Sequence, residues 1–214
     1  MITPQIEQWL EQAGYEHHCF ISYPRIQNPD MIECAERIQR SIEENLALEL
    51  NNPKVFLDKS IRVGADWENR LRRALCRSIS MVALCSPIYY HPAHRWCGLE
   101  WAAMWGLEGQ RLRPEDDHAI IPLIIRDPNN LPDSVARIQY IDISRVTIAG
   151  RRYYTTQEFR SVITQITDRI ISTALAIARN QAATNCGQFQ FPPTSAFADY
   201  QPVNLAAPFR SQKP

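Results

Sequence analysis

The chain has 214 residues, 45% of them hydrophobic, and its 23 Lys and Arg balance its 23 Asp and Glu to a formal net charge of zero. This balance argues against a nonspecific nucleic-acid binder and against attraction to anionic membranes. The longest apolar run, residues 119–125, is short and contains Pro122, and the N-terminus lacks a basic leader before an apolar stretch, so we expect a soluble cytoplasmic protein without a membrane span.

Apolar residues follow strand spacing and helix spacing in turn along the chain. In chain order, the patterns predict a helix at 4–13, a strand at 19–23, a helix at 30–46, a strand at 55–57, a helix after Asp66, a strand at 79–85, a loop at 86–94, a helix at 95–109, strands at 119–125 and 139–143, and a helix at about 157–180. Strands that alternate with helices indicate a parallel sheet with helices on both faces.

Residues 181–214 differ in composition, being rich in Gln, Ala and Pro, with three charged residues and no hydrophobic period. This composition favours a disordered tail. Its five Phe and Tyr residues support the alternative, a segment that docks onto its own domain or a neighbouring protomer. We therefore divide the chain into an N-terminal helical extension (1–14), an α/β domain (15–180) and this tail.

The six cysteines are scattered, with no Cys-x-x-Cys pair, and several lie in apolar runs where a thiol packs as a small hydrophobic group. A chain of this length buries a core without disulfides, so we expect six reduced thiols, with a disulfide framework or zinc site as the minor alternative. The five histidines also lack metal-ligand spacing, and no metal site is predicted.

Ligands of an open parallel sheet bind outside the carboxyl ends of its strands. This rule selects Ser22, Tyr23, Asp58, Ser86 and the start of the helix that follows Ser86. The chain has only seven glycines, and it contains no Gly-x-Gly, Gly-Lys-Ser/Thr or Gly-x-Ser-x-Gly motif. A dinucleotide-binding turn, a phosphate-binding loop and a nucleophile elbow are therefore not predicted.

Glu100 is the only ionisable residue between Trp96 and Leu107 if cysteine is set aside. A helix that is apolar nearly all round is buried, and a carboxylate within it must find a partner, raise its pKa or line a cleft. The Trp96 indole, four residues earlier, is expected on the same helix face. An acid beside an aromatic wall is suited to hold a sugar attached to a planar base. Trp67, Trp101 and Trp105 are expected in the core or an interface.

Three motifs together resemble the Toll/interleukin-1 receptor (TIR) domain, over about residues 15–180. They are Phe20-Ile21-Ser22-Tyr23, Val55-Phe56-Leu57-Asp58 with Gly64 in the following loop, and Trp96-Cys97-x-x-Glu100. The resemblance implies a flavodoxin-like three-layer sandwich whose five parallel strands have the order 2-1-3-4-5. It also points to the bacterial, NAD+-cleaving members of the family.

The resemblance implies a site in which Glu100 is the catalytic residue. The residues implied to bind substrate are Phe20, Ser22, Tyr23, Arg25, Asp58, Arg62 and Trp96. The loop through Arg62 and Gly64 is implied to close over the site and to mediate self-association, and Pro24 departs from members with a basic pair at that position.

The implied activity is cleavage of the nicotinamide–ribose bond of NAD+, to give nicotinamide and ADP-ribose or a cyclic product. NAD+ is then the substrate, with no cofactor or metal, and further partners are other TIR domains and a separate effector or sensor protein in antiviral immune defence. Two alternatives remain: a non-catalytic TIR scaffold in signalling, and a nucleoside deoxyribosyltransferase-like enzyme, which also places a Glu at a ribosyl centre.

Overall fold

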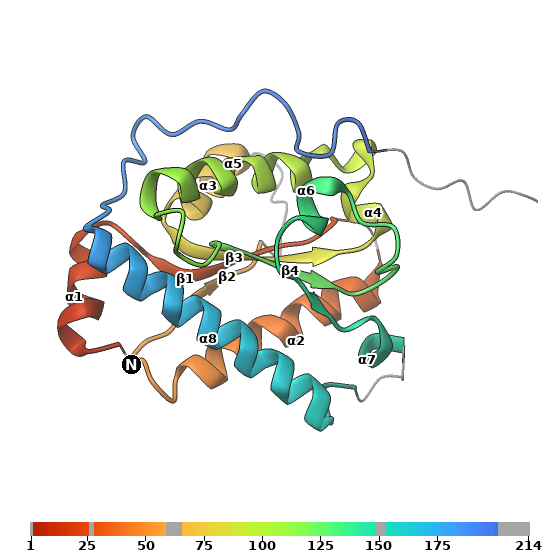
Figure 1. The fold of residues 1–214 in the computed structure, drawn as a ribbon, viewed down its shortest axis with the longest axis horizontal. Coiled ribbons are helices and arrows are strands. Elements are labelled where there is room, and N and C mark those ends of the chain that lie inside the picture. Colours follow the sequence, from red (N-terminus) through yellow and green to blue (C-terminus); the bar gives the residue numbers. More distant parts are fainter. Residues whose placement is uncertain (1, 26–27, 59–65, 149–152, 201–214) are drawn as a thin grey trace, which may run out of the picture.

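The computed structural model describes residues 2–25, 28–58, 66–148 and 153–200. At its centre lies a parallel sheet of five strands in the order β2-β1-β3-β4-β5 (Figure 1). The strands are β1 (His17–Ser22), β2 (Val55–Phe56), β3 (Ser78–Cys85), β4 (Ile120–Ile124) and β5 (Ile141–Asp142). The predicted flavodoxin-like α/β fold and its strand order are confirmed.

Helices cover both faces of this sheet and form a three-layer sandwich (Figure 1). One layer contains α1 (Pro4–Gln12), α2 (Pro29–Leu46), α7 (Ser144–Ile148) and α8 (Gln157–Asn180). The other contains α3 (Trp67–Cys76), α4 (Pro87–Tyr90), α5 (Arg95–Arg111) and α6 (Asp133–Ala136). Short 3-10 turns lie at Pro92–His94 and Tyr153–Thr155.

Strand β1 shows how the sheet divides the core. Cys19 and Ile21 pack with α2 and α8, whereas Phe20 packs with α3 and α5, because successive side chains of a strand point to opposite faces. Every residue of β3 is buried, as expected for a central strand covered on both faces. Ser22, the last residue of β1, pairs with Ala83 of β3 and faces the α5 layer.

The helix ends follow the capping residues of the sequence. The Asp66 side chain accepts a hydrogen bond from the Asn69 amide, as expected for the N-cap of α3. The Thr156 side chain likewise accepts from Phe159 at the start of α8. Gln181 ends α8 in the left-handed conformation, with φ of 52°, and this turns the chain out of the helix.

Residues 182–200, here called the strap, run from the end of α8 over the outer side of α5 (Figure 1). The Ala196 amide donates to the carbonyl of Gly98 at 3.0 Å, and Phe197 is 3% exposed in the α3/α5 core. A Cβ atom added to Gly98 would fall on the Ser195 side chain and within 3.2 Å of Phe197, so glycine permits this close approach. Residues 182–200 thus pack against α5 of the same chain, and residues 201–214 of the predicted tail lie outside the described residues.

The expectation of six reduced thiols is wrong. Cys186 of the strap forms a disulfide with Cys76, the last residue of α3, while Cys19, Cys34, Cys85 and Cys97 are free. The two bonded cysteines are separated by 110 positions, and Cys186 lies in a segment without periodicity. Neither spacing nor pattern therefore indicated the pair.

The remaining differences are short elements. The segment predicted as a loop at 86–94 contains α4 and a 3-10 turn, and α6 and α7 were not predicted. These helices have four or five residues, too few for a helical period to be visible.

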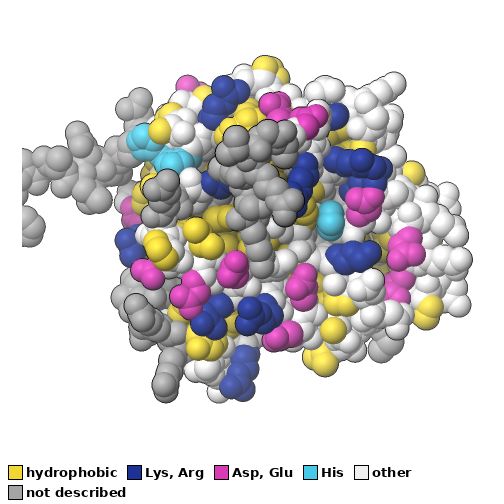
Figure 2. All heavy atoms as spheres, turned by 180° about the vertical axis from the view of Figure 1, so that it is seen from behind, with side chains coloured by type: hydrophobic (Ala, Val, Ile, Leu, Met, Phe, Trp, Pro, Cys, Tyr) yellow, Lys and Arg dark blue, Asp and Glu magenta, His cyan; other side chains and the backbone are white. Residues whose placement is uncertain are grey.

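Within the described residues, no helix is long and apolar enough to cross a membrane. On the face shown in Figure 2, Lys and Arg side chains alternate with Asp and Glu, so no large patch of one charge forms among the residues drawn in colour. The overall charge balance thus extends to the local surface.

Candidate active site

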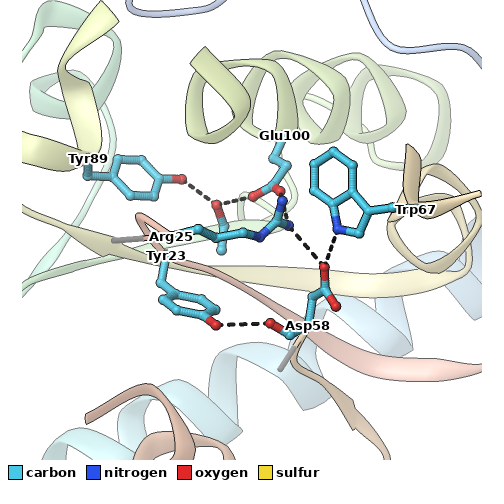
Figure 3. Close-up of polar contacts among 7 residues, drawn as sticks. Tyr23, Arg25, Asp58, Trp67, Tyr89 and Glu100 are labelled. Carbon is cyan, nitrogen blue, oxygen red and sulfur yellow. Dashed lines mark hydrogen bonds and ion pairs between the residues drawn. The ribbon is translucent and has the colours of Figure 1, made fainter. Parts of the chain in front are cut away.

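Polar side chains from several elements meet at the carboxyl end of β1 (Figure 3). Ser22 is the last residue of β1, Asp58 follows β2 by two positions, and Glu100 points toward them from α5. In the strand order β2-β1-β3, the chain reverses direction of winding between β1 and β3. Ligands of doubly wound sheets bind at this switch point.

The Glu100 carboxyl group is held by two separate contacts. Its Oε2 accepts a hydrogen bond from Ser22 Oγ at 2.5 Å, and its Oε1 accepts one from Arg25 Nη2 at 3.1 Å. The Tyr89 hydroxyl of α4 lies 2.8 Å from Ser22 Oγ. Glu100 is only 2% exposed, so its contacts are made in an interior of low polarity.

Burial raises the pKa of Glu100 from 4.5 to about 7. The Arg25 guanidinium and the Ser22 hydrogen bond oppose this rise because both stabilise the charged form, and the nearby Asp58 carboxylate adds to it. Near neutral pH, the carboxyl group therefore divides between its protonated and ionised forms. A change in the position of Arg25 would shift that balance.

Arg25 links Glu100 to a second acid. Its Nη2 lies 3.6 Å from Asp58 Oδ2, and its guanidinium lies over the Trp67 ring, 4.4 Å from the centroid. Trp67 Nε1 donates to the same Asp58 oxygen at 2.5 Å, and the Tyr23 hydroxyl donates to the Asp58 carbonyl at 2.9 Å. We call Ser22, Arg25, Asp58, Trp67, Tyr89 and Glu100 the acid cluster.

Two polar atoms of the acid cluster lack a hydrogen-bond partner among the described residues. They are Arg25 Nε and Asp58 Oδ1, both shielded from solvent. Buried polar groups in folded proteins are nearly always satisfied, so an unmatched donor and acceptor at one site indicate capacity for a ligand or water.

The structure brings Ser22, Tyr23, Arg25 and Asp58 together with Glu100, as the sequence resemblance implied. Arg62, together with Gly64, lies outside the described residues. The grouping concerns position only; the roles of these residues are part of the proposal below.

Phe20 and Trp96 make ring contacts and no side-chain hydrogen bond to the charged groups of the acid cluster. Phe20 is 1% exposed and stacks on Phe56 with 5.2 Å between ring centroids, so in this structure it is a core residue. The Trp96 ring meets Trp67 edge-on at 4.7 Å and Phe191 of the strap at 5.5 Å. Trp96 thus supports Trp67, and Trp67 is the indole that covers the charged groups.

Trp67 packs against the α3/α5 core as expected, but its contact with Asp58 was not predicted, and Tyr89 was missed. Trp67 is the first residue of α3, directly after the loop that follows β2, and that position alone places it at the carboxyl edge of the sheet. For Tyr89 the available signal was Ser86-Pro87, a typical helix start after β3.

The cavities described in this structure lie elsewhere. One of about 470 Å³ is bordered by α6 and the end of the strap, and one of about 450 Å³ by α5 and the start of the strap. Neither is lined by a residue of the acid cluster. The described residues contain no group of three or more His, Cys, Asp or Glu arranged for a metal ion.

Comparison with protein families agrees with this geometry. The family model described as the TIR domain matches residues 19–153, which is more than half of the chain and runs from within β1 to beyond β5. Comparisons with curated proteins and with solved structures give no match. The sheet order, the acid cluster at the switch point and the family match together establish that this chain belongs to the TIR domain family, whose members act in signalling or cleave NAD+.

Proposed function

We propose that this protein cleaves the nicotinamide–ribose bond of NAD+, releasing nicotinamide and ADP-ribose or a cyclic ADP-ribose product. The observation that carries the proposal is the buried carboxyl group of Glu100 at the switch point of the sheet. One of its oxygens is held by Ser22 and the other by the long side chain of Arg25. NAD+ is the substrate, and the proposed chemistry requires no cofactor.

The chemistry follows from the charge that develops during cleavage. Nicotinamide leaves as a neutral base from a cationic ring, so its departure needs little acid assistance. The ribosyl carbon becomes electron-poor and resembles the oxocarbenium ion of glycoside hydrolysis. A fixed carboxylate near the ribose stabilises that charge most effectively in a site shielded from water. Glu100 in its ionised form fills this role.

Arg25 must leave Glu100 for the substrate to reach it, since the carboxyl group is 2% exposed and closed by the ion pair. The diphosphate of NAD+ supplies an alternative partner, because guanidinium groups bind phosphate oxygens through paired N–H donors. Arg25 Nε, which has no hydrogen-bond partner in the described part of the chain, can donate to such a group. Arg25 thus exchanges one anion for another, and Glu100 Oε1 becomes free to face the ribose.

The physiological part of the proposal is a role in antiviral immune defence. Self-association through TIR–TIR contacts would activate cleavage, and either loss of NAD+ or a nucleotide product would signal to a separate effector or sensor protein. The TIR family match supports the signalling context.

The test measures nicotinamide release from NAD+ over a series of protein concentrations, with and without a crowding agent. Glu100→Gln should abolish release, since an amide keeps the shape but carries no charge. Glu108→Gln is the matched control, because Glu108 lies on the same helix and contacts His118 instead. Absence of release from the wild-type protein at every concentration, or unchanged release in Glu100→Gln, would overturn the proposal.

A non-catalytic TIR scaffold is the second candidate. Both Glu100 oxygens are already satisfied within the chain, which also fits a purely structural acid. Light scattering separates the two: a scaffold assembles and shows no NAD+ turnover at any stage of assembly.

A further inference from the structure

Tyr89 is buried behind the acid cluster. It lies on α4, is fully buried, and its hydroxyl lies 2.8 Å from Ser22 Oγ (Figure 3). Its ring packs edge-on against Tyr90 and Phe197, with centroids 5.7 and 5.8 Å away. The ring is therefore held by apolar packing, and the hydroxyl is the part of the side chain directed at the site.

The direction of the hydrogen bonds follows from counting protons. Ser22 has one hydroxyl hydrogen, and it is donated to Glu100 Oε2 when the carboxylate is ionised. Ser22 Oγ can then only accept from Tyr89, so the order is Tyr89 to Ser22 to Glu100. Burial raises the pKa of Tyr89 well above 10, so the phenol keeps its proton at neutral pH.

We propose that Tyr89 is a positioning residue that acts through Ser22 to fix Glu100 Oε2, so that only Oε1 is exchanged between Arg25 and the substrate. This inference rests on the proposed NAD+ cleavage. The Tyr89 hydroxyl bonds Ser22 and not Glu100, so Tyr89 is not itself catalytic. A serine hydroxyl alone rotates among three staggered positions, and the Tyr89 donor selects the one that faces the carboxylate.

The arrangement gives the two Glu100 oxygens different tasks. Oε2 is held by the Ser22 hydroxyl, which in turn accepts from Tyr89, and both residues are buried. Oε1 is held by Arg25, whose side chain is 19% exposed and can turn toward a ligand. A carboxylate that keeps one oxygen fixed while the other changes partner loses little orientation during the exchange, which is the requirement for a preorganised site.

Tyr89→Phe tests the proposal, and Tyr90→Phe is its matched control. Both substitutions remove one hydroxyl from adjacent, buried tyrosines of α4 and leave the rings in place. The Tyr90 hydroxyl faces the Cys85 thiol, which is not part of the acid cluster. We expect Tyr89→Phe to lower kcat for nicotinamide release about five-fold with KM within a factor of about two, and Tyr90→Phe to match the wild type.

A second readout does not depend on activity. The protonated Glu100 carboxyl is followed by difference infrared spectroscopy against pH, and its band is assigned by its absence in Glu100→Gln. Tyr89→Phe should raise the titration midpoint by roughly half a pH unit, because the charged form loses support. The other titratable groups that interact with Glu100 are Tyr23, Arg25, Asp58 and Cys97, and all are kept in both variants.

The double variant Ser22→Ala/Tyr89→Phe decides whether Tyr89 acts through Ser22. If it does, the second substitution adds no further change in the midpoint to that of Ser22→Ala alone. The proposal is overturned if Tyr89→Phe behaves like Tyr90→Phe in the titration, or if the two effects add. A wild-type protein that titrates as expected but releases no nicotinamide would instead refute the proposed function and leave the positioning contact in place.

Discussion

Glu100→Gln should change how the stability of the protein depends on pH. Burial raises the pKa of Glu100 from 4.5 to about 7, so between these values the folded chain retains a proton that the unfolded chain releases. The free energy of unfolding then falls as the pH rises through this window, because the folded state binds more protons. Below pH 4.5 both states are protonated and the effect is absent.

The magnitude follows from the same two values. The interval from 4.5 to about 7, at about 1.4 kcal/mol for each pH unit, corresponds to on the order of 3 kcal/mol. Glutamine keeps the shape of the side chain and does not ionise. We therefore expect the wild type to lose on the order of 3 kcal/mol more than Glu100→Gln between about pH 4 and pH 8.

Urea unfolding followed by circular dichroism at closely spaced pH values gives both stability curves. Their difference isolates Glu100, because the histidines and other titrating groups are common to both proteins. Glu44→Gln, at an exposed position of α2, controls for the loss of one charge. Parallel curves for wild type and Glu100→Gln, or a difference that grows in favour of the wild type with rising pH, would refute the reasoning.

Further substitutions test the contacts of α5 and the strap. Cys186→Ser should lower the free energy of unfolding by about 2–4 kcal/mol, since the bond to Cys76 closes a long loop, and reductant should weaken the wild type alone in urea unfolding. Gly98→Ala should lower the free energy of unfolding by about 1–3 kcal/mol, because the added methyl group meets the Ser195 side chain. Ser195→Gly in the same chain should restore part of that loss. Unchanged stability of Gly98→Ala would show that the strap does not lie against α5. Arg111→Met should lower the free energy of unfolding, measured by thermal denaturation, by about 2–4 kcal/mol, because the carbonyls of Cys76 and Ser78 lose a hydrogen-bond donor. Unchanged stability would contradict these contacts.

The sequence predicted the layers of the fold and the central acid for the same reason. Apolar residues that pack in the core recur with the spacing of a helix or a strand. A charged residue within such a pattern is therefore easy to recognise. Glu100 stood out because its neighbours on the helix are apolar, and it is indeed 2% exposed. The strand order came from the family resemblance, since periodicity does not state which strands are neighbours.

The missed residues have side chains that are both apolar and polar. Tyr89 and Trp67 fit an apolar pattern by their rings, and only the structure shows that a hydroxyl and an indole N–H point at charged groups. Phe20 lies on the same face of β1 as Ser22, two residues earlier in the strand, where it stacks on Phe56. The alternation of side chains along a strand shows which face each residue lies on, but not how far it lies from the edge of the sheet.

The strap has a practical consequence for any shortened version of this protein. The family match ends at residue 153, yet α8 and the strap follow it and bury residues on both faces of the sheet. Expressing the matched segment alone would uncover the apolar side of β1 and β3. Ending the chain after Asn180 would leave Cys76 as an unpaired thiol near one end of α5 and remove Phe197 from the core near the other end. The folding unit of this protein is therefore longer than its family signature, and fusion partners are better joined at the N-terminal end than inserted before residue 200.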